Sequence, residues 1–183
     1  MRRSLNEVQA LVLKAGRGAG LPLGLAQDLA AAVPWMGQAI ETLPEALQVS
    51  GTTRLPERQP DALVFEEARA VMDGPCALDL ARAETGQALE LRNLDAPEIL
   101  QALISCNRAV TGKDMVVEKV GPEDLRLTAR SEDLEVAPSA GRPPLMVGQE
   151  TWTRLEKLAA KTFVPESESS RASGAGAGLS DND

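Results

Sequence analysis

The stretch DAPEILQALISCNRAV (95–110) lies where the hydrophobic periodicity of this chain changes. Asp95 suits an N-cap and Pro97 suits a first turn, and the apolar residues that follow recur at helical spacing. The pattern therefore predicts a helix over 95–110. Beyond it, residues 115–120 and the apolar/polar alternation of 125–130 are typical of strands joined by tight turns. We expect this helix to pack beside a small antiparallel sheet.

Helical spacing dominates the chain on the N-terminal side of this junction. The other predicted helices cover residues 5–15, 24–33, 37–48, 61–72 and, near the C-terminus, 149–162. Ser4 and Glu7 match a capping box, which predicts the start of the first helix. Pro34 is expected to bend or stop the second helix. The segment LVF (63–65) can equally begin a strand, so the helix over 61–72 has a stated alternative.

Together these patterns favour an α+β fold, with an α-helical N-terminal half followed by a small antiparallel β-sheet with packed helices. We expect residues 1–165 to form a single compact domain, because this length is ample for one hydrophobic core. The segment PSAGRPP (138–144) is expected to link the sheet to the last helix. Residues 166–183 are expected to form a Gly/Ser-rich acidic tail.

The composition excludes several classes of function. Of the 183 residues, 43% are hydrophobic but only 2% are aromatic, and histidine and tyrosine are absent. Without histidine, imidazole acid–base catalysis and Ser-His nucleophile pairs are excluded, and no metal site is expected. The formal net charge of −8 disfavours binding to nucleic acid or to an anionic membrane.

The N-terminus and the cysteines bear on location. In MRRSLNEVQ (1–9), polar residues interrupt the apolar segment that a secretory signal needs. Cys76 and Cys106 stand alone in the sequence, which is typical of reduced thiols rather than of a disulfide framework. We therefore expect a soluble, cytoplasmic protein.

The segment GRGAG (16–20) is the first candidate ligand-binding site. Arg17, Gly18 and Gly20 precede a helix, and a guanidinium beside a helix N-terminus suits a carboxylate or a phosphate. The alternative is an ordinary turn between two helices, with glycine at the C-cap. Trp35 is a candidate wall of the same pocket, although a large apolar side chain is more often a core residue.

The C-terminal SRASGAGAGLSDND (170–183) is the second candidate. Its glycines resemble part of a phosphate-binding loop, but no strand precedes them, and neither a helix nor a Lys-Ser/Thr pair follows. Both nucleotide motifs are therefore rejected. An anion held by Ser170 and Arg171, with Gly174 and Gly176 as a hinge, remains a hypothesis beside that of an unanchored tail.

The opening SLNEVQALVLKAGRGAGLPLGLAQDLAAAVPWM (4–36) and the close TFVPESESSRASGAGAGLSDND (162–183) resemble a bacterial family known only as a domain of unknown function, DUF3726. The resemblance extends, more weakly, through the middle of the chain. It implies a compact, soluble, bacterial and cytoplasmic protein, and it implies no activity or cofactor. The family pattern has an aromatic residue after the Gly-Leu-Pro turn where this chain has Leu23, so no stacking role is expected there.

Two functions are compatible with these observations. The first is an accessory or ligand-binding protein without a recognisable catalytic set, whose partner is a small anionic molecule or another protein. The alternative is a small-molecule enzyme or enzyme subunit, with an anion-accepting pocket that the C-terminal tail closes. The sequence identifies no cofactor and no catalytic residue.

Overall fold

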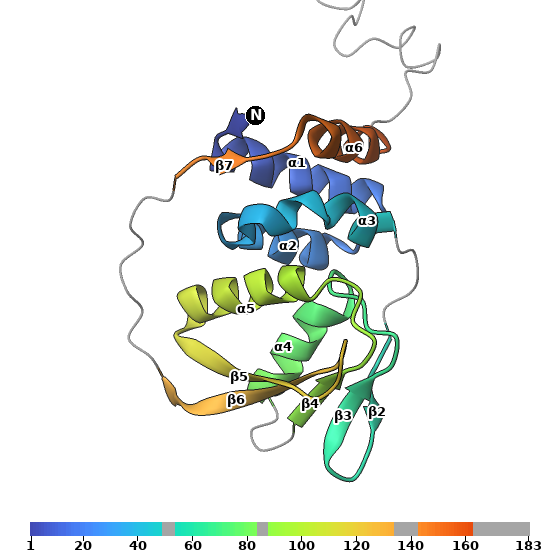
Figure 1. Cartoon of the computed structure of the whole chain (residues 1–183), viewed down its shortest axis with the longest axis vertical. Helices are drawn as coiled ribbons and strands as arrows, with labels where there is room; N and C mark the ends of the chain where they lie inside the picture. Colours follow the sequence, from blue (N-terminus) through green and yellow to red (C-terminus); the bar gives the residue numbers. More distant parts are fainter. Residues whose placement is uncertain (49–53, 84–87, 134–142, 163–183) are drawn as a thin grey trace, which may run out of the picture.

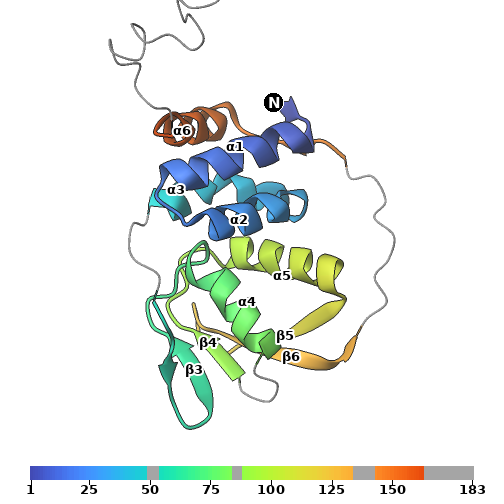
Figure 2. The same cartoon turned by 180° about the vertical axis from the view of Figure 1, so that it is seen from behind.

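The structure is a computed structural model that describes residues 1–48, 54–83, 88–133 and 143–162. It is a stack of helices on one side of a five-stranded sheet (Figures 1 and 2). The helices are α1 (Leu5–Gly18), α2 (Leu23–Met36), the 3-10 helix η1 (Gly37–Glu41), α3 (Leu43–Gln48), α4 (Asp73–Ala83), α5 (Pro97–Thr111) and α6 (Gln149–Ala160). The strands are β1 (Arg2–Arg3), β2 (Glu57–Arg58), β3 (Ala62–Phe65), β4 (Ala88–Leu91), β5 (Lys113–Lys119), β6 (Leu125–Asp133) and β7 (Leu145–Met146). The α+β class is thus confirmed.

The first two helices follow the predicted pattern. Ser4 caps α1 in a capping box: the backbone N–H of Glu7 donates to Ser4 Oγ (3.3 Å), and the backbone N–H of Ser4 donates to Glu7 Oε2 (3.0 Å). Helix α2 continues through Pro34 to Met36 and ends at Gly37, whose φ is 51°. Pro34 therefore does not stop the helix, and only Trp35 and Met36 follow it in α2.

The sheet is mixed rather than purely antiparallel. Its strand order is β2-β3-β4-β6-β5, with β3 parallel to β4 and the other pairs antiparallel. The parallel pair is joined by a crossover that contains α4. The helix expected over 61–72 is wrong: residues 62–65 are the strand β3 with all four residues buried, residues 66–72 form turns and loop, and the helix α4 begins only at Asp73. An apolar run this short is compatible with either element, as the alternative stated for 63–65 allowed.

The predicted helix over 95–110 and the strands that follow it are confirmed as a helix and a hairpin. Helix α5 ends before Gly112, whose φ is 72°, and β5 then pairs with β6. Asp95 is not the N-cap, because Ala96 occupies that position. The Asp95 carboxylate instead accepts a hydrogen bond from the backbone N–H of Ala70 (2.8 Å), which ties the start of α5 to the loop after β3.

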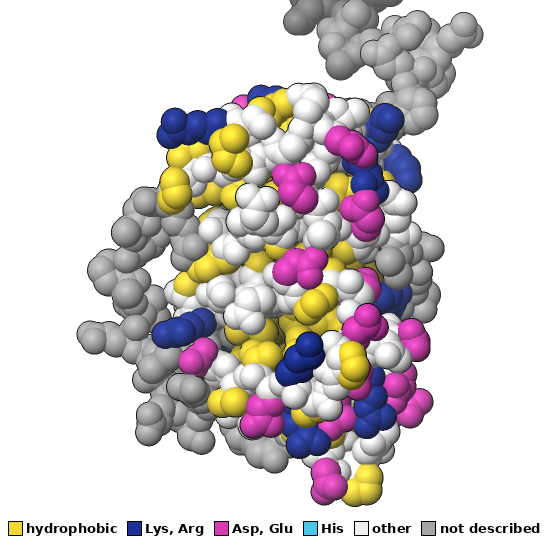
Figure 3. Space-filling view, viewed as in Figure 1, with side chains coloured by type: hydrophobic (Ala, Val, Ile, Leu, Met, Phe, Trp, Pro, Cys, Tyr) yellow, Lys and Arg dark blue, Asp and Glu magenta, His cyan; other side chains and the backbone are white. Residues whose placement is uncertain are grey.

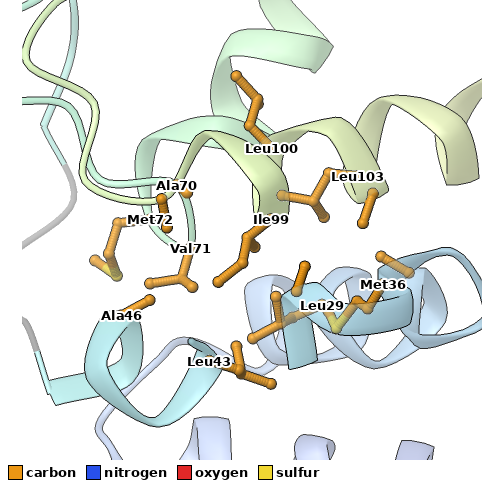
Figure 4. Packing of buried hydrophobic residues seen from close by; sticks show 14 of the residues in the cluster. Leu29, Met36, Leu43, Ala46, Ala70, Val71, Met72, Ile99, Leu100 and Leu103 are labelled. Atoms are coloured by element: carbon orange, nitrogen blue, oxygen red, sulfur yellow. The ribbon is translucent and has the colours of Figure 1, made fainter. Parts of the chain in front are cut away.

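Helices α4 and α5 form the layer that covers the sheet, and we call α1, α2, η1, α3 and α6 the helix stack. One hydrophobic cluster contains buried residues of both parts. In Figure 4, Leu29, Leu43 and Ala46 approach Val71, just before α4, and Ile99 of α5, on the side of the layer that covers the sheet. Helix α6 closes the stack at the far side by packing against α1. Within the described ranges, no helix combines the length and the apolar character that a membrane span needs.

Candidate functional site

The turn between α1 and α2 borders an open hollow of about 460 Å³, which we call the α1–α2 hollow. The residues that line it are Leu13, Lys14, Arg17, Gly18, Gly20, Leu23, Lys161 and Thr162. Three of the predicted site residues, Arg17, Gly18 and Gly20, therefore lie together. Lys14 and Lys161 join them, and sequence reasoning had not selected either.

The two glycines of this turn have structural roles. A Cβ atom on Gly18 would lie 1.8 Å from the carbonyl oxygen of Leu158, so only glycine allows α1 and α6 to approach this closely. Gly20 has a φ of 95°, which L side chains rarely adopt, and it lets the chain turn into α2. The alternative of a helix–helix turn is thus compatible with the structure, and the chemistry of the hollow depends on its cationic side chains.

Those cations have no acidic counterpart in the lining. Lys14, Arg17 and Lys161 are exposed, and none of the described residues that line the hollow is acidic. Arg17 Nη1 donates to the carbonyl oxygen of Leu21 (2.8 Å), which orients the guanidinium across the turn. Helix α2 begins beside it with Pro22 as N-cap and without a side-chain cap, so its first amides add positive potential.

The other predicted site residues do not join this group. Trp35 is half-buried against the hydrophobic core and is not among the residues that line the α1–α2 hollow. Its expected place in the same pocket is therefore wrong for this hollow. Ser170, Arg171, Gly174 and Gly176, and with them the whole tail hypothesis, lie outside the described residues.

A second hollow, the α2–α4–α5 cavity, was not predicted. It has a volume of about 220 Å³, and its polar lining includes Asp28 of α2, Asp79 and Arg82 of α4 and Asn107 of α5. It was missed because no helix was predicted over residues 73–83, where α4 begins at Asp73. Proline within a first helical turn, the same signal used for α5, would have revealed that helix.

The polar groups of this cavity are poorly satisfied. Arg82 Nη1 lies 3.4 Å from Asp79 Oδ1 and 3.4 Å from Asn107 Oδ1, both near the outer limit of a hydrogen bond. Arg82 Nε and Asn107 Nδ2 are buried and have no hydrogen-bond partner in the described part of the chain. Partial burial, and then the nearby Asp79 carboxylate, raise the pKa of Asp28.

The Cys76 thiol is poorly suited to nucleophilic chemistry. Cys106 is buried and lines the α2–α4–α5 cavity, and Cys76 is half-buried at the start of α4. Burial, followed by the carboxylates of Asp73 and Asp79, raises the pKa of Cys76. A thiol with a raised pKa is a poor nucleophile at neutral pH.

A further hollow, at the start of α5, is lined by the carboxylates of Glu41, Glu45, Asp95 and Glu98. Three of these carboxylates, those of Glu41, Glu45 and Glu98, hold neighbouring parts of the fold together. Glu41 accepts hydrogen bonds from the backbone N–H of Gly148 (2.7 Å) and from the hydroxyl of Thr151. Glu98 accepts a hydrogen bond from Thr42 Oγ1 (2.7 Å), and Glu45 pairs with Arg154. No group of three or more candidate ligands that could hold a metal ion occurs among the described residues.

No curated protein and no solved structure matches this chain. One family model does match it. Its description is "Protein of unknown function (DUF3726)", and the match covers residues 3–60, from β1 through α3 to the strand β2. The matched segment contains the whole turn between α1 and α2. Over residues 3–60, the resemblance of this chain to the DUF3726 family is therefore confirmed.

Proposed function

We propose that this protein is a ligand-binding protein whose α1–α2 hollow takes a small anion, such as a carboxylate or a phosphate. The observation that carries the proposal is the charge of the lining. Lys14, Arg17 and Lys161 surround the hollow without an acidic neighbour in the described lining, although the chain has a formal net charge of −8. Cations gathered on an acidic protein create a local positive potential that attracts anions.

The scaffold holds these cations in a defined arrangement. Lys14 and Arg17 lie one turn apart on α1, and Lys161 comes from the end of α6, which the close contact at Gly18 holds against α1. Among the described residues, Arg17 makes one side-chain hydrogen bond, to Leu21, and a guanidinium carries five N–H groups. With respect to the described residues, most of its donors are therefore available for a carboxylate or a phosphate.

The lining supports binding more than catalysis. It contains no described carboxylate or thiol, and the chain has no histidine, so the hollow lacks an ordinary general base. We infer a cytoplasmic location in a bacterial cell. The free thiols of Cys76 and Cys106 support the location, and the family resemblance supports the bacterial source.

The experiment is a titration of the full chain with inorganic phosphate, sulfate, acetate and citrate. Calorimetry measures the affinity, and amide chemical shifts locate the bound anion. We expect at least one anion to bind and to shift the backbone amide signals of residues 17–21, 23 and 24. Arg17→Gln and Lys161→Gln are each expected to weaken binding by about tenfold, as loss of a charge-assisted contact does. Lys119→Gln removes an exposed cation from β5 and is the matched control, with unchanged affinity expected.

Three results would contradict the proposal. The first is that none of the four anions binds at millimolar concentration. The second is that binding persists unchanged in both Arg17→Gln and Lys161→Gln. The third is an equal loss of affinity in the Lys119→Gln control, because that loss would report the overall charge of the protein rather than this hollow.

A further inference from the structure

We propose that the α2–α4–α5 cavity binds a small zwitterion of the free amino acid type. In this arrangement the ligand carboxylate accepts hydrogen bonds from Arg82 and Asn107, its ammonium group lies beside Asp28 and Asp79, and its side chain contacts the apolar wall. This site is separate from the α1–α2 hollow and shares no lining residue with it.

The donors on one side of the cavity lack an acceptor. Arg82 Nε and Asn107 Nδ2 are buried without a partner among the described residues, and Arg82 Nη1 makes only two long contacts of 3.4 Å. Buried donors are nearly always hydrogen-bonded in folded proteins, so two orphans on neighbouring side chains indicate a missing acceptor. A small rotation of the guanidinium would present Nε and Nη to a carboxylate as a two-point donor.

The carboxylates on the rim lack a full counter-charge. Among the described residues, Asp28 has no hydrogen bond or ion pair, and Asp79 has one ion pair, with Arg82. The carboxylates of Asp28 and Asp79 and the guanidinium of Arg82 give the lining a net charge of −1. An ammonium group near Asp28 and Asp79 offsets that charge, while a carboxylate on the same ligand engages Arg82.

The size and the wall of the cavity limit the ligand. The volume of about 220 Å³ is below the roughly 300–1,000 Å³ typical of pockets for drug-sized ligands, which excludes a nucleotide. Leu78, Leu103 and Val110 supply an apolar surface, which suits the short aliphatic side chain of an amino acid.

The test is a screen of single free amino acids with the full chain, by thermal shift and then by calorimetry. We expect at least one aliphatic amino acid to bind and to raise the Tm. Its N-acetyl derivative lacks the ammonium group, and its amide lacks the carboxylate. Both are expected to bind more weakly by about tenfold or more, the loss expected when a charge-assisted hydrogen bond is removed.

Paired variants locate the site. Arg82→Gln and Asp28→Asn are each expected to weaken amino acid binding by about tenfold or more. The matched controls are Arg108→Gln, an exposed arginine on α5, and Asp61→Asn, an exposed aspartate before β3, and both are expected to bind normally. The Tm of each variant without ligand shows whether it still folds, and whichever anion binds the α1–α2 hollow of the parent protein should bind all four variants as well.

Three outcomes would overturn the inference. The first is that no amino acid binds at millimolar concentration. The second is that the amide binds as well as the free amino acid, which would make the site a cation site. The third is unchanged binding in folded Arg82→Gln and Asp28→Asn proteins, which would place the ligand elsewhere.

Discussion

At the scale of single residues, the lack of a side chain at Gly18 allows α1 and α6 to pack closely. A Cβ added at this position would lie 1.8 Å from the carbonyl oxygen of Leu158, so Gly18→Ala must push α6 away from α1. We expect a loss of about 1–3 kcal/mol in the free energy of unfolding, typical of overpacking. Gly24→Ala is the control, because nothing lies within 4 Å of its added Cβ. Urea unfolding measures both, and an equal effect at the two positions would refute the packing role.

Glu90 gives a residue-scale prediction about pH. Hydrogen bonds from Arg126 Nε (3.1 Å) and Arg92 Nη2 (2.8 Å), in that order of effect, lower the pKa of Glu90 below its ordinary value of 4.5. Figure 3 shows acidic and basic side chains interspersed over the sheet end of the molecule. Because the folded-state pKa is lowered, the stabilisation is complete above about pH 4.5 and is lost as the pH falls through the lowered value.

The variant Glu90→Gln tests whether ionised Glu90 stabilises the fold in a pH-dependent way. At neutral pH we expect it to lose about 1–2 kcal/mol, a modest value because both guanidinium groups are partly exposed. The difference from the parent protein should shrink as the pH falls below 4.5. Urea unfolding across this pH range measures it, with the exposed Glu57→Gln on β2 as control. A difference that stays constant down to acid pH would contradict the ion-pair explanation.

At the scale of elements, α6 depends on a cap supplied from elsewhere in the chain. Its N-cap, Gly148, has no side chain, and the carboxylate of Glu41 accepts a hydrogen bond from the Gly148 N–H instead. We expect Glu41→Ala to lose about 1–2 kcal/mol, as loss of a helix cap does. Amide exchange should rise first at residues 149–152. Glu45→Ala removes an exposed pair with Arg154 and should cost less; equal losses would refute the capping role.

The helices and strands differ in how well they could be predicted from the sequence pattern. Helices α1, α5 and α6 have clear apolar periods and were predicted, as was the hairpin of β5 and β6. Strand β3 is buried along its whole length, so its four residues carry no alternation to distinguish it from a helix. Helix α4 was missed because the helix expected in this region was placed over 61–72, ahead of its actual start at Asp73. Arg17, Gly18 and Gly20 were placed together through adjacency along the chain, whereas Lys161 and the whole α2–α4–α5 cavity depend on packing between distant segments.

At the scale of the whole molecule, the helix stack and the sheet share one hydrophobic cluster. Leu29 of α2 is fully buried and faces Ile99 of α5 across the boundary between them (Figure 4). We therefore expect the two parts to unfold together. Leu29→Ala should destabilise both by about 2–5 kcal/mol, the range for large-to-small core changes. Separate units would confine this loss to the helix stack.

The two tryptophans allow the unfolding of the helix stack to be measured separately from that of the sheet. Trp35 and Trp152 both lie in the helix stack, on α2 and α6, so tryptophan fluorescence reports on the stack alone. Amide exchange of β4 and β6 reports on the sheet. In a cooperative protein both probes give the same urea midpoint, in the parent and in Leu29→Ala. If the sheet instead stays protected at urea concentrations where the fluorescence has already changed, residues on the two sides of the Leu29–Ile99 contact fold as separate units.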